Sequence, residues 1–178
     1  MVPVLTICVV TPLLVILCWK DCRYRLLPNT YTIGMAVLGL IWRFAFGGIP
    51  GLVDGLLGGL VCAGFLFIPF LMKGAGGGDL KMMFAAGIFT GFRYCCAEML
   101  FVSIAGLLLG LMMLIAGKVN AARLKHFLRT IFDWRYDRKS GAENLPEKKD
   151  EKTRVPFGVA IAIGTVVTLL YIYLMERS

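Results

Sequence analysis

The sequence is poor in the residues that most metal and redox sites require. It has a single histidine, His126, and none of its six cysteines is paired with another in a CxxC motif. Zinc sites and thiol–disulfide motifs need such side chains at close spacing, so we expect no metal and no cofactor. No serine or cysteine has a nearby base, which disfavours nucleophilic catalysis. We interpret the cysteines as small apolar side chains that fill the core.

Acidic residues are also scarce, with 11 Asp and Glu against 19 Lys and Arg and a formal net charge of +8. Most of the cations lie in three stretches between apolar blocks. That distribution is typical of a protein oriented in a membrane, and it does not suit a nucleic-acid surface. We therefore expect the lipid bilayer as a partner and no nucleic acid.

Apolar residues are the abundant class, at 58% of the chain with a mean hydropathy of +0.78. They form blocks that approach the roughly 20 residues needed for a helix to cross a bilayer. We expect an all-α integral membrane protein, a polytopic bundle of six transmembrane helices forming one domain over residues 1–178. The expected helices span residues 2–18, 31–46, 52–72, 80–95, 99–116 and 156–174. The fourth of these is short for a full span.

The cations also predict the orientation. Six helices place both termini on one side, and sixteen of the 19 Lys and Arg fall in the loops after the first, third and fifth helices. Positive loops remain in the cytoplasm, so we expect these three loops to be cytoplasmic and both termini to be outside. Arg43 is one of the three remaining cations, and we expect its long side chain to reach the lipid headgroups.

A long cytoplasmic loop is expected before the last helix, over residues 118–155. Its first part, about 119–134, has apolar residues at helical spacing between cations. This pattern predicts a basic amphipathic helix on the anionic leaflet. The remainder, 135–154, is almost wholly polar, and we predict no regular structure there.

Apart from Glu176 near the end of the sequence, four acidic residues lie in or beside the apolar blocks, where an ionised side chain is costly and invites a functional explanation. Asp21 ends the first expected helix and Asp79 opens the fourth, so both belong to the cytoplasmic face. Asp54 and Glu98 fall on the outer side, and we interpret them as ordinary helix-start residues facing the positive end of a helix dipole. Two carboxylates at one depth can share a proton and activate a water molecule.

Glycines surround Asp79, with Gly76 and Gly78 in the segment GAGGGD that ends at this residue. Glycine permits close approach of another chain to the backbone, so a substrate strand could lie beside the carboxylate. Glycine-rich segments also serve as plain flexible turns. Lys81 has two readings as well, as a cation that favours an ionised carboxylate or as an anchor at the helix end.

Three motifs now make the chain similar to a known family. The segment 76–81, GGGDLK, resembles the GxGDxK signature of the type IV prepilin peptidases, and the segment 21–29, DCRYRLLPN, resembles the second signature of that family. The segment 155–158, VPFG, looks like the opening of the family's final helix. The motifs occur in order over nearly the whole chain.

The resemblance implies that Asp21 and Asp79 are the catalytic pair of a membrane-embedded aspartic endopeptidase. It implies prepilins, Flp-type prepilins or pseudopilins as substrates, cleaved at the cytoplasmic face of the bacterial inner membrane to remove a short basic leader. Gly76, Gly78 and Lys81 would bind substrate or shape the loop. Larger members carry paired CxxC motifs after their first helix, and this chain has room there only for a short loop, so it resembles the peptidase-only form.

Two other classes of protein remain as alternatives. A small transporter or channel could use Asp21 and Asp79 as proton or cation ligands, although such sites tend to lie near the middle of the bilayer. An intramembrane protease of the presenilin kind also uses GxGD, but its partner aspartate typically lies within a helix after a tyrosine. Here Asp21 follows Lys20 at a helix end.

Overall fold

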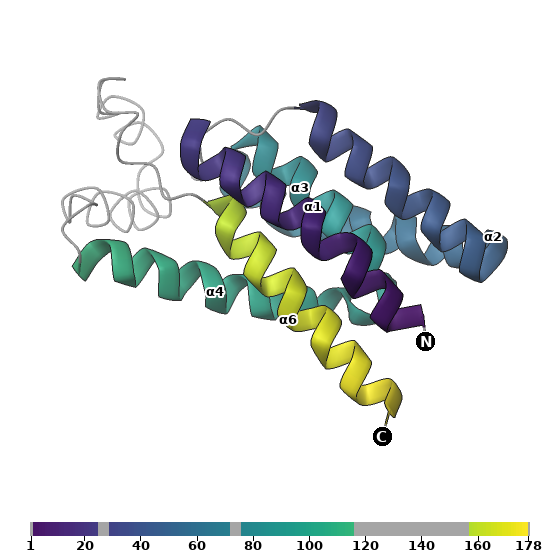
Figure 1. Cartoon of the computed structure of the whole chain (residues 1–178). Helices are drawn as coiled ribbons and strands as arrows, with labels where there is room; N and C mark the ends of the chain where they lie inside the picture. The colour runs from purple at the N-terminus through teal and green to yellow at the C-terminus, as the bar shows by residue number, and fades with distance from the viewer. Residues whose placement is uncertain (1, 25–28, 72–75, 116–156, 178) are drawn as a thin grey trace, which may run out of the picture. The chain divides into compact units, whose positions relative to one another are not determined.

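The structure is a computed structural model that describes residues 2–24, 29–71, 76–115 and 157–177. All the regular structure in these ranges is helical, and no strand occurs among them (Figure 1). The elements are α1 (Val2–Tyr24), α2 (Asn29–Leu71), α3 (Gly77–Thr90), the 3₁₀ helix η1 (Phe92–Tyr94), α4 (Cys95–Ile115) and α6 (Phe157–Arg177).

Of the described helices, α1, α2, α4 and α6 are long and apolar enough to cross a membrane. The expectation of an all-α, multi-pass membrane protein is therefore confirmed, while the total of six spans and the side on which the termini lie stay predictions. The amphipathic helix expected at 119–134 and the polar segment after it lie outside the described residues.

The chain forms two compact units, one of residues 1–107 with 156–178 and one of residues 108–155. The first unit contains α1, α2, α3, η1, the larger part of α4, and α6. Of the second unit the structure describes the end of α4, where Leu108, Leu111, Met112 and Ile115 expose their side chains. These exposed apolar side chains fit a lipid environment.

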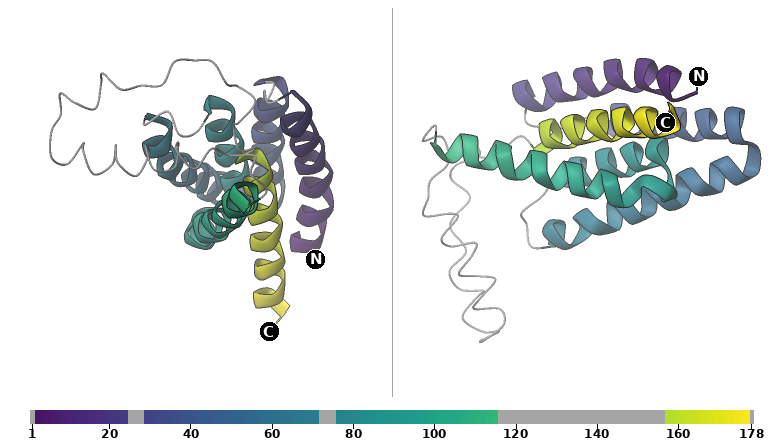
Figure 2. Two further views of the ribbon diagram at one scale, coloured as in Figure 1. Left: turned by 90° about the vertical axis from the view of Figure 1, so that its left-hand side faces the viewer. Right: turned by 90° about the horizontal axis from the view of Figure 1, so that it is seen from below.

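Helix α2 folds back on itself. A straight helix of its 43 residues would be about 65 Å long, more than twice the thickness of the hydrocarbon core. Gly48 interrupts it with φ 58° and ψ −151°, a conformation open to glycine, and Pro50 follows. The second arm runs back from the bend at an angle to the first (Figure 2), and an ion pair of 3.2 Å between Arg43 Nη1 and Asp54 Oδ2 links the two arms there. The helices expected at 31–46 and 52–72 are these two arms.

Helix α3 is the buried centre of the first unit. It packs on both arms of α2 and also contacts α6. Eight of its 14 residues are buried, so almost every face of the helix is covered by protein. One close approach is between Gly58 and Gly87, where a Cβ atom on Gly58 would lie 2.6 Å from the Gly87 carbonyl oxygen. Small residues of this kind allow two membrane helices to pack backbone to backbone.

The end of α3 differs from the expected helix over 80–95, since α3 stops at Thr90 and α4 begins at Cys95. Gly91 adopts φ 80° and ψ 170°, and its N–H donates to the Gly87 carbonyl. Arg43 Nε donates to the Ile88 carbonyl at 3.0 Å. A cation at the C-terminal end of a helix satisfies its unpaired carbonyls and complements its dipole. The Arg43 side chain, expected to extend to the headgroups, contacts Asp54 and this helix end.

Candidate functional site

Four helix ends of the first unit meet at one end of the bundle (Figure 1). The Lys20 ammonium lies 3.8 Å from the centroid of the Tyr31 ring, which joins the end of α1 to the start of α2. Lys81 Nζ donates to Asn29 Oδ1 at 2.8 Å, which joins α3 to α2. Gly158 N–H donates to Asp21, which joins α6 to α1. We call this region, which includes Asp79 at the start of α3, the carboxylate end.

Asp21 is one of the few buried acidic side chains in the described part of the chain, with 7% of its surface exposed. Its Oδ2 atom accepts a hydrogen bond of 3.0 Å from the backbone N–H of Gly158, in the first turn of α6. The first N–H groups of a helix have no partner within it and carry the positive end of the dipole. The start of α6 is therefore a favourable neighbour for a carboxylate.

Asp79 lies in the first turn of α3 and is half-buried. Its Oδ2 atom accepts a hydrogen bond of 3.0 Å from the N–H of Gly76, the residue just before the helix. The carboxylate thus caps the start of its own helix, where the dipole favours negative charge. Asp21 and Asp79 share one arrangement, in which a carboxylate oxygen accepts a backbone N–H at the start of a helix.

The remaining predicted site residues adjoin Asp79. Gly76 has extended backbone angles, φ −84° and ψ 153°, and a Cβ atom there would lie 3.2 Å from Asp79 Oδ2. Gly78 is half-buried within the first turn of α3. Lys81 is exposed, and the side chain to which it donates a hydrogen bond, Asn29, is uncharged. This contact ties α2 to α3 and agrees with an anchoring role for Lys81.

Asp54 and Glu98 have stronger partners than the helix dipoles expected for them. Asp54 pairs with Arg43 across the bend of α2. Glu98 is completely buried, and its Oε1 atom lies 2.6 Å from the hydroxyl oxygen of Thr165 on α6. Neither carboxyl group is at the carboxylate end. Sequence reasoning missed these two contacts and the Gly158 contact, because each joins residues on different helices or on different arms of α2.

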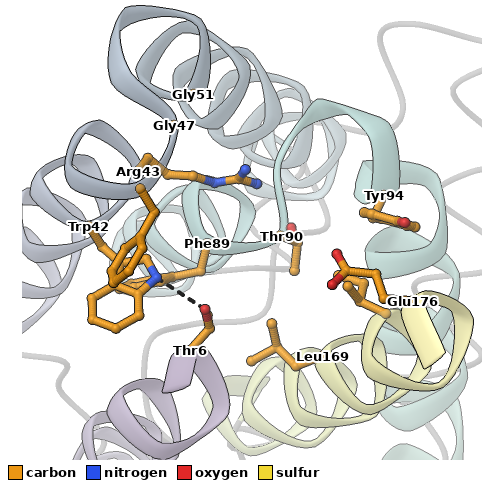
Figure 3. Close-up of a pocket in the computed structure, with 12 residues that line it drawn as sticks. Thr6, Trp42, Arg43, Gly47, Gly51, Phe89, Thr90, Tyr94, Leu169 and Glu176 are labelled. Atoms are coloured by element: carbon orange, nitrogen blue, oxygen red, sulfur yellow. Dashed lines mark hydrogen bonds between the residues drawn. The ribbon is translucent and has the colours of Figure 1, made fainter. Parts of the chain in front are cut away.

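A cavity of about 200 Å³ lies at the opposite end of the first unit (Figure 3). It is lined by the bend of α2, the end of α3 and parts of α1, η1 and α6. Arg43 and Glu176 lie on its wall, and Trp42 Nε1 donates to Thr6 Oγ1 at 3.0 Å beside it. No predicted site residue lines this cavity, so it is separate from the carboxylate end.

Comparison with known proteins identifies the family. A family model described as the type IV leader peptidase family matches residues 8–114, a range that contains Asp21 and Asp79 but not α6. Neither the search of curated proteins nor the search of solved structures returned a match. The family match covers more than half of the chain and includes both residues that the motifs had singled out. The chain therefore belongs to the type IV leader peptidase family.

Proposed function

We propose that the protein is an aspartic endopeptidase that removes the short basic leader of type IV prepilins, Flp-type prepilins or pseudopilins. Its membership of a peptidase family supports the reaction class. The main structural support is that Asp21 and Asp79 come from different helices and both lie at the carboxylate end. The Oδ2 atom of each accepts a hydrogen bond of 3.0 Å from a backbone N–H.

The reaction needs one ionised and one protonated carboxyl group around a water molecule. The ionised member takes a proton from water as the hydroxide attacks the scissile carbonyl carbon. The protonated member donates to the carbonyl oxygen, which gives a tetrahedral intermediate. When the C–N bond breaks, the first carboxyl group returns its proton to the leaving amine, and the second recovers its proton from the collapsing hydroxyl group. Asp21 and Asp79 are proposed for these roles, and no metal is required.

We also propose that the carboxylate end faces the cytoplasm. The distribution of Lys and Arg supports this orientation, because sixteen of the 19 lie in the loops on that side. The two arms of α2 then count as separate spans and, with α1, α3, α4 and α6, give a total of six. Both termini would then lie outside. The cleavage site would lie at the inner face of the bacterial cytoplasmic membrane, where a basic leader meets an apolar helix.

The short segment between α1 and α2 indicates a peptidase that does not methylate its product. Only four residues, 25–28, separate Tyr24 from Asn29. No CxxC pair occurs anywhere in the sequence. We therefore propose the peptidase-only form, and the trimmed pilin should carry an unmethylated N-terminus when this protein is the only processing enzyme present.

The decisive experiment is processing of a co-expressed prepilin, followed by its mobility shift. Asp21→Asn and Asp79→Asn retain the shape of the side chain and remove the charge, so the protein should still insert into the membrane. Residues that act as one unit are strongly non-additive, so each single variant should be nearly as inactive as the double variant. Glu98→Gln and Glu176→Gln are the controls and should process normally. Processing by either Asp variant at a rate near that of the wild type would refute the mechanism.

A further inference from the structure

The contact between Asp21 and Gly158 joins residues 137 positions apart in the sequence. Gly158 lies in the first turn of α6, outside the range that the family model matches. Both residues are buried, so the hydrogen bond of 3.0 Å is shielded from water. A hydrogen bond to a charged group is stronger than one between neutral groups, and shielding strengthens it further.

The absence of a side chain at position 158 is required by this contact. A Cβ atom on Gly158 would lie 2.6 Å from Asp21 Oδ2 and 3.1 Å from its Cγ. The first distance is shorter than real Cβ contacts and the second is unusually tight, so an added side chain would displace the carboxylate or the start of α6. Glycine also lets the backbone N–H approach the carboxylate oxygen directly.

The contact affects Asp21 in two ways. It fixes the rotation of the carboxylate, because Oδ2 must point at the N–H. It also places the positive end of the α6 dipole beside the carboxylate. The charged groups described at the carboxylate end are Lys20, Asp79 and Lys81, and the two lysines have Tyr31 and Asn29 as partners. Gly158 is a backbone donor to Asp21 from another helix.

We propose that Gly158 is a positioning residue for Asp21, so that the start of α6 is a third structural element of the active site beside α1 and α3. This inference rests on the proposed function, because it gives Gly158 a role through a carboxylate that is itself proposed to react. Gly158 acts by holding the carboxylate and makes no contact with substrate in this role.

The N–H can be removed without adding an atom by replacing Gly158 with glycolic acid, which converts the amide to an ester. Loss of one hydrogen bond to a carboxylate should lower kcat about tenfold to a hundredfold, while KM for the prepilin and the melting temperature in detergent stay close to those of the wild type. The matched control is α-hydroxyvaline in place of Val159, which removes the next N–H of the same helical turn and should leave kcat within about twofold.

A second pair of variants tests whether a side chain at position 158 would collide with Asp21. Gly158→Ala retains the N–H but places a methyl group against Asp21, and it should lower kcat at least as much as the ester. Gly106→Ala is its control. The added Cβ would lie 3.1 Å from the ring of Phe157, the residue before Gly158, and would not contact Asp21. That variant should remain active.

The outcomes separate this inference from the proposed function. If Asp21→Asn is inactive but the ester at position 158 has the kcat of the wild type, the positioning role is wrong and the aspartic mechanism stands. Equal loss of kcat with both esters would also overturn the positioning role, since it would reflect a weakened helix start. If Asp21→Asn remains active, both proposals fail.

Discussion

The carboxyl group of Glu98 and the hydroxyl group of Thr165 lie 2.6 Å apart, in the buried contact between α4 and α6. The Thr165 hydroxyl also lies 2.7 Å from the carbonyl oxygen of Ile161. A hydroxyl group has one proton to donate. The hydroxyl group is placed to donate to Glu98 Oε1 or to the Ile161 carbonyl. When its one proton is directed at Ile161, the contact with Glu98 requires a proton on the carboxyl group.

A neutral Glu98 also agrees with its surroundings. Its second oxygen, Oε2, is buried and has no hydrogen-bond partner among the described residues. An ionised carboxylate in this position would have an unpaired charge in a membrane interior, which is far more costly than an unpaired carbonyl oxygen. With a protonated Glu98, the contact joins α4 to α6 through hydrogen bonds without any charge.

The first prediction is that Glu98 is protonated at neutral pH. Infrared spectra of the purified protein should show the carbonyl stretch of a buried carboxylic acid, and Glu98→Gln should remove it. The amide of Gln can still donate to Thr165, so Glu98→Gln should unfold within about 1 kcal/mol of the wild type. Thr165→Val removes the acceptor and should cost about 1 kcal/mol. A spectrum in which Glu98→Gln changes nothing in the acid region would contradict the assignment.

The second prediction concerns the ion pair that holds the end of α3. Asp54→Asn removes one partner of Arg43 and should lower the free energy of unfolding by about 1 kcal/mol. Arg43→Met removes both the ion pair and the hydrogen bond to Ile88, and it should cost about 2 to 3 kcal/mol. Denaturation in mixed micelles measures both. Exchange of the two charges in Arg43→Asp with Asp54→Arg should not restore stability, because the cap on Ile88 is still missing.

The third prediction tests the packing of α2 against α3. In Gly58→Ala the added methyl group would lie 2.6 Å from the Gly87 carbonyl oxygen, and the backbone cannot yield easily there. We expect a loss of about 1 to 3 kcal/mol, the usual range for overpacking. Gly64→Ala, on the same arm of α2, is the matched control because nothing lies within 4 Å of the added Cβ. Equal stability of the two variants would show that the close contact is unimportant.

The fourth prediction concerns orientation. Cysteines introduced by Ser140→Cys and Ser178→Cys, in a background without reactive native thiols, should differ in their reaction with a membrane-impermeant reagent. In intact cells we expect labelling at position 178 and none at position 140, because the loop 118–155 carries eleven of the cations and should be cytoplasmic. The reverse pattern would place the carboxylate end outside the cell and remove the basis of the proposed reaction.

Hydropathy and short motifs predicted the parts of this fold that depend on local sequence. Apolar blocks indicated the helices. The signatures around Asp21 and Asp79 indicated two residues that both lie at one end of the first unit. The contacts that depend on distant residues were not predictable. Arg43 reaches a carbonyl 45 positions away and Asp21 an N–H 137 positions away. Hydropathy treated Arg43 as a surface cation because it contains no information about which helix lies beside it.

The burial of α3 has a consequence for how the protein responds to different lipids. From Met82 to Thr90 no residue of α3 is exposed, and the helix is only about 21 Å long. Helices in contact with lipid tilt or shift when the bilayer becomes thicker or thinner. Helix α3 is held by protein on almost all sides, so its level is determined by the surrounding helices. Asp79 should therefore keep its position relative to Asp21 and Gly158 in membranes of different thickness.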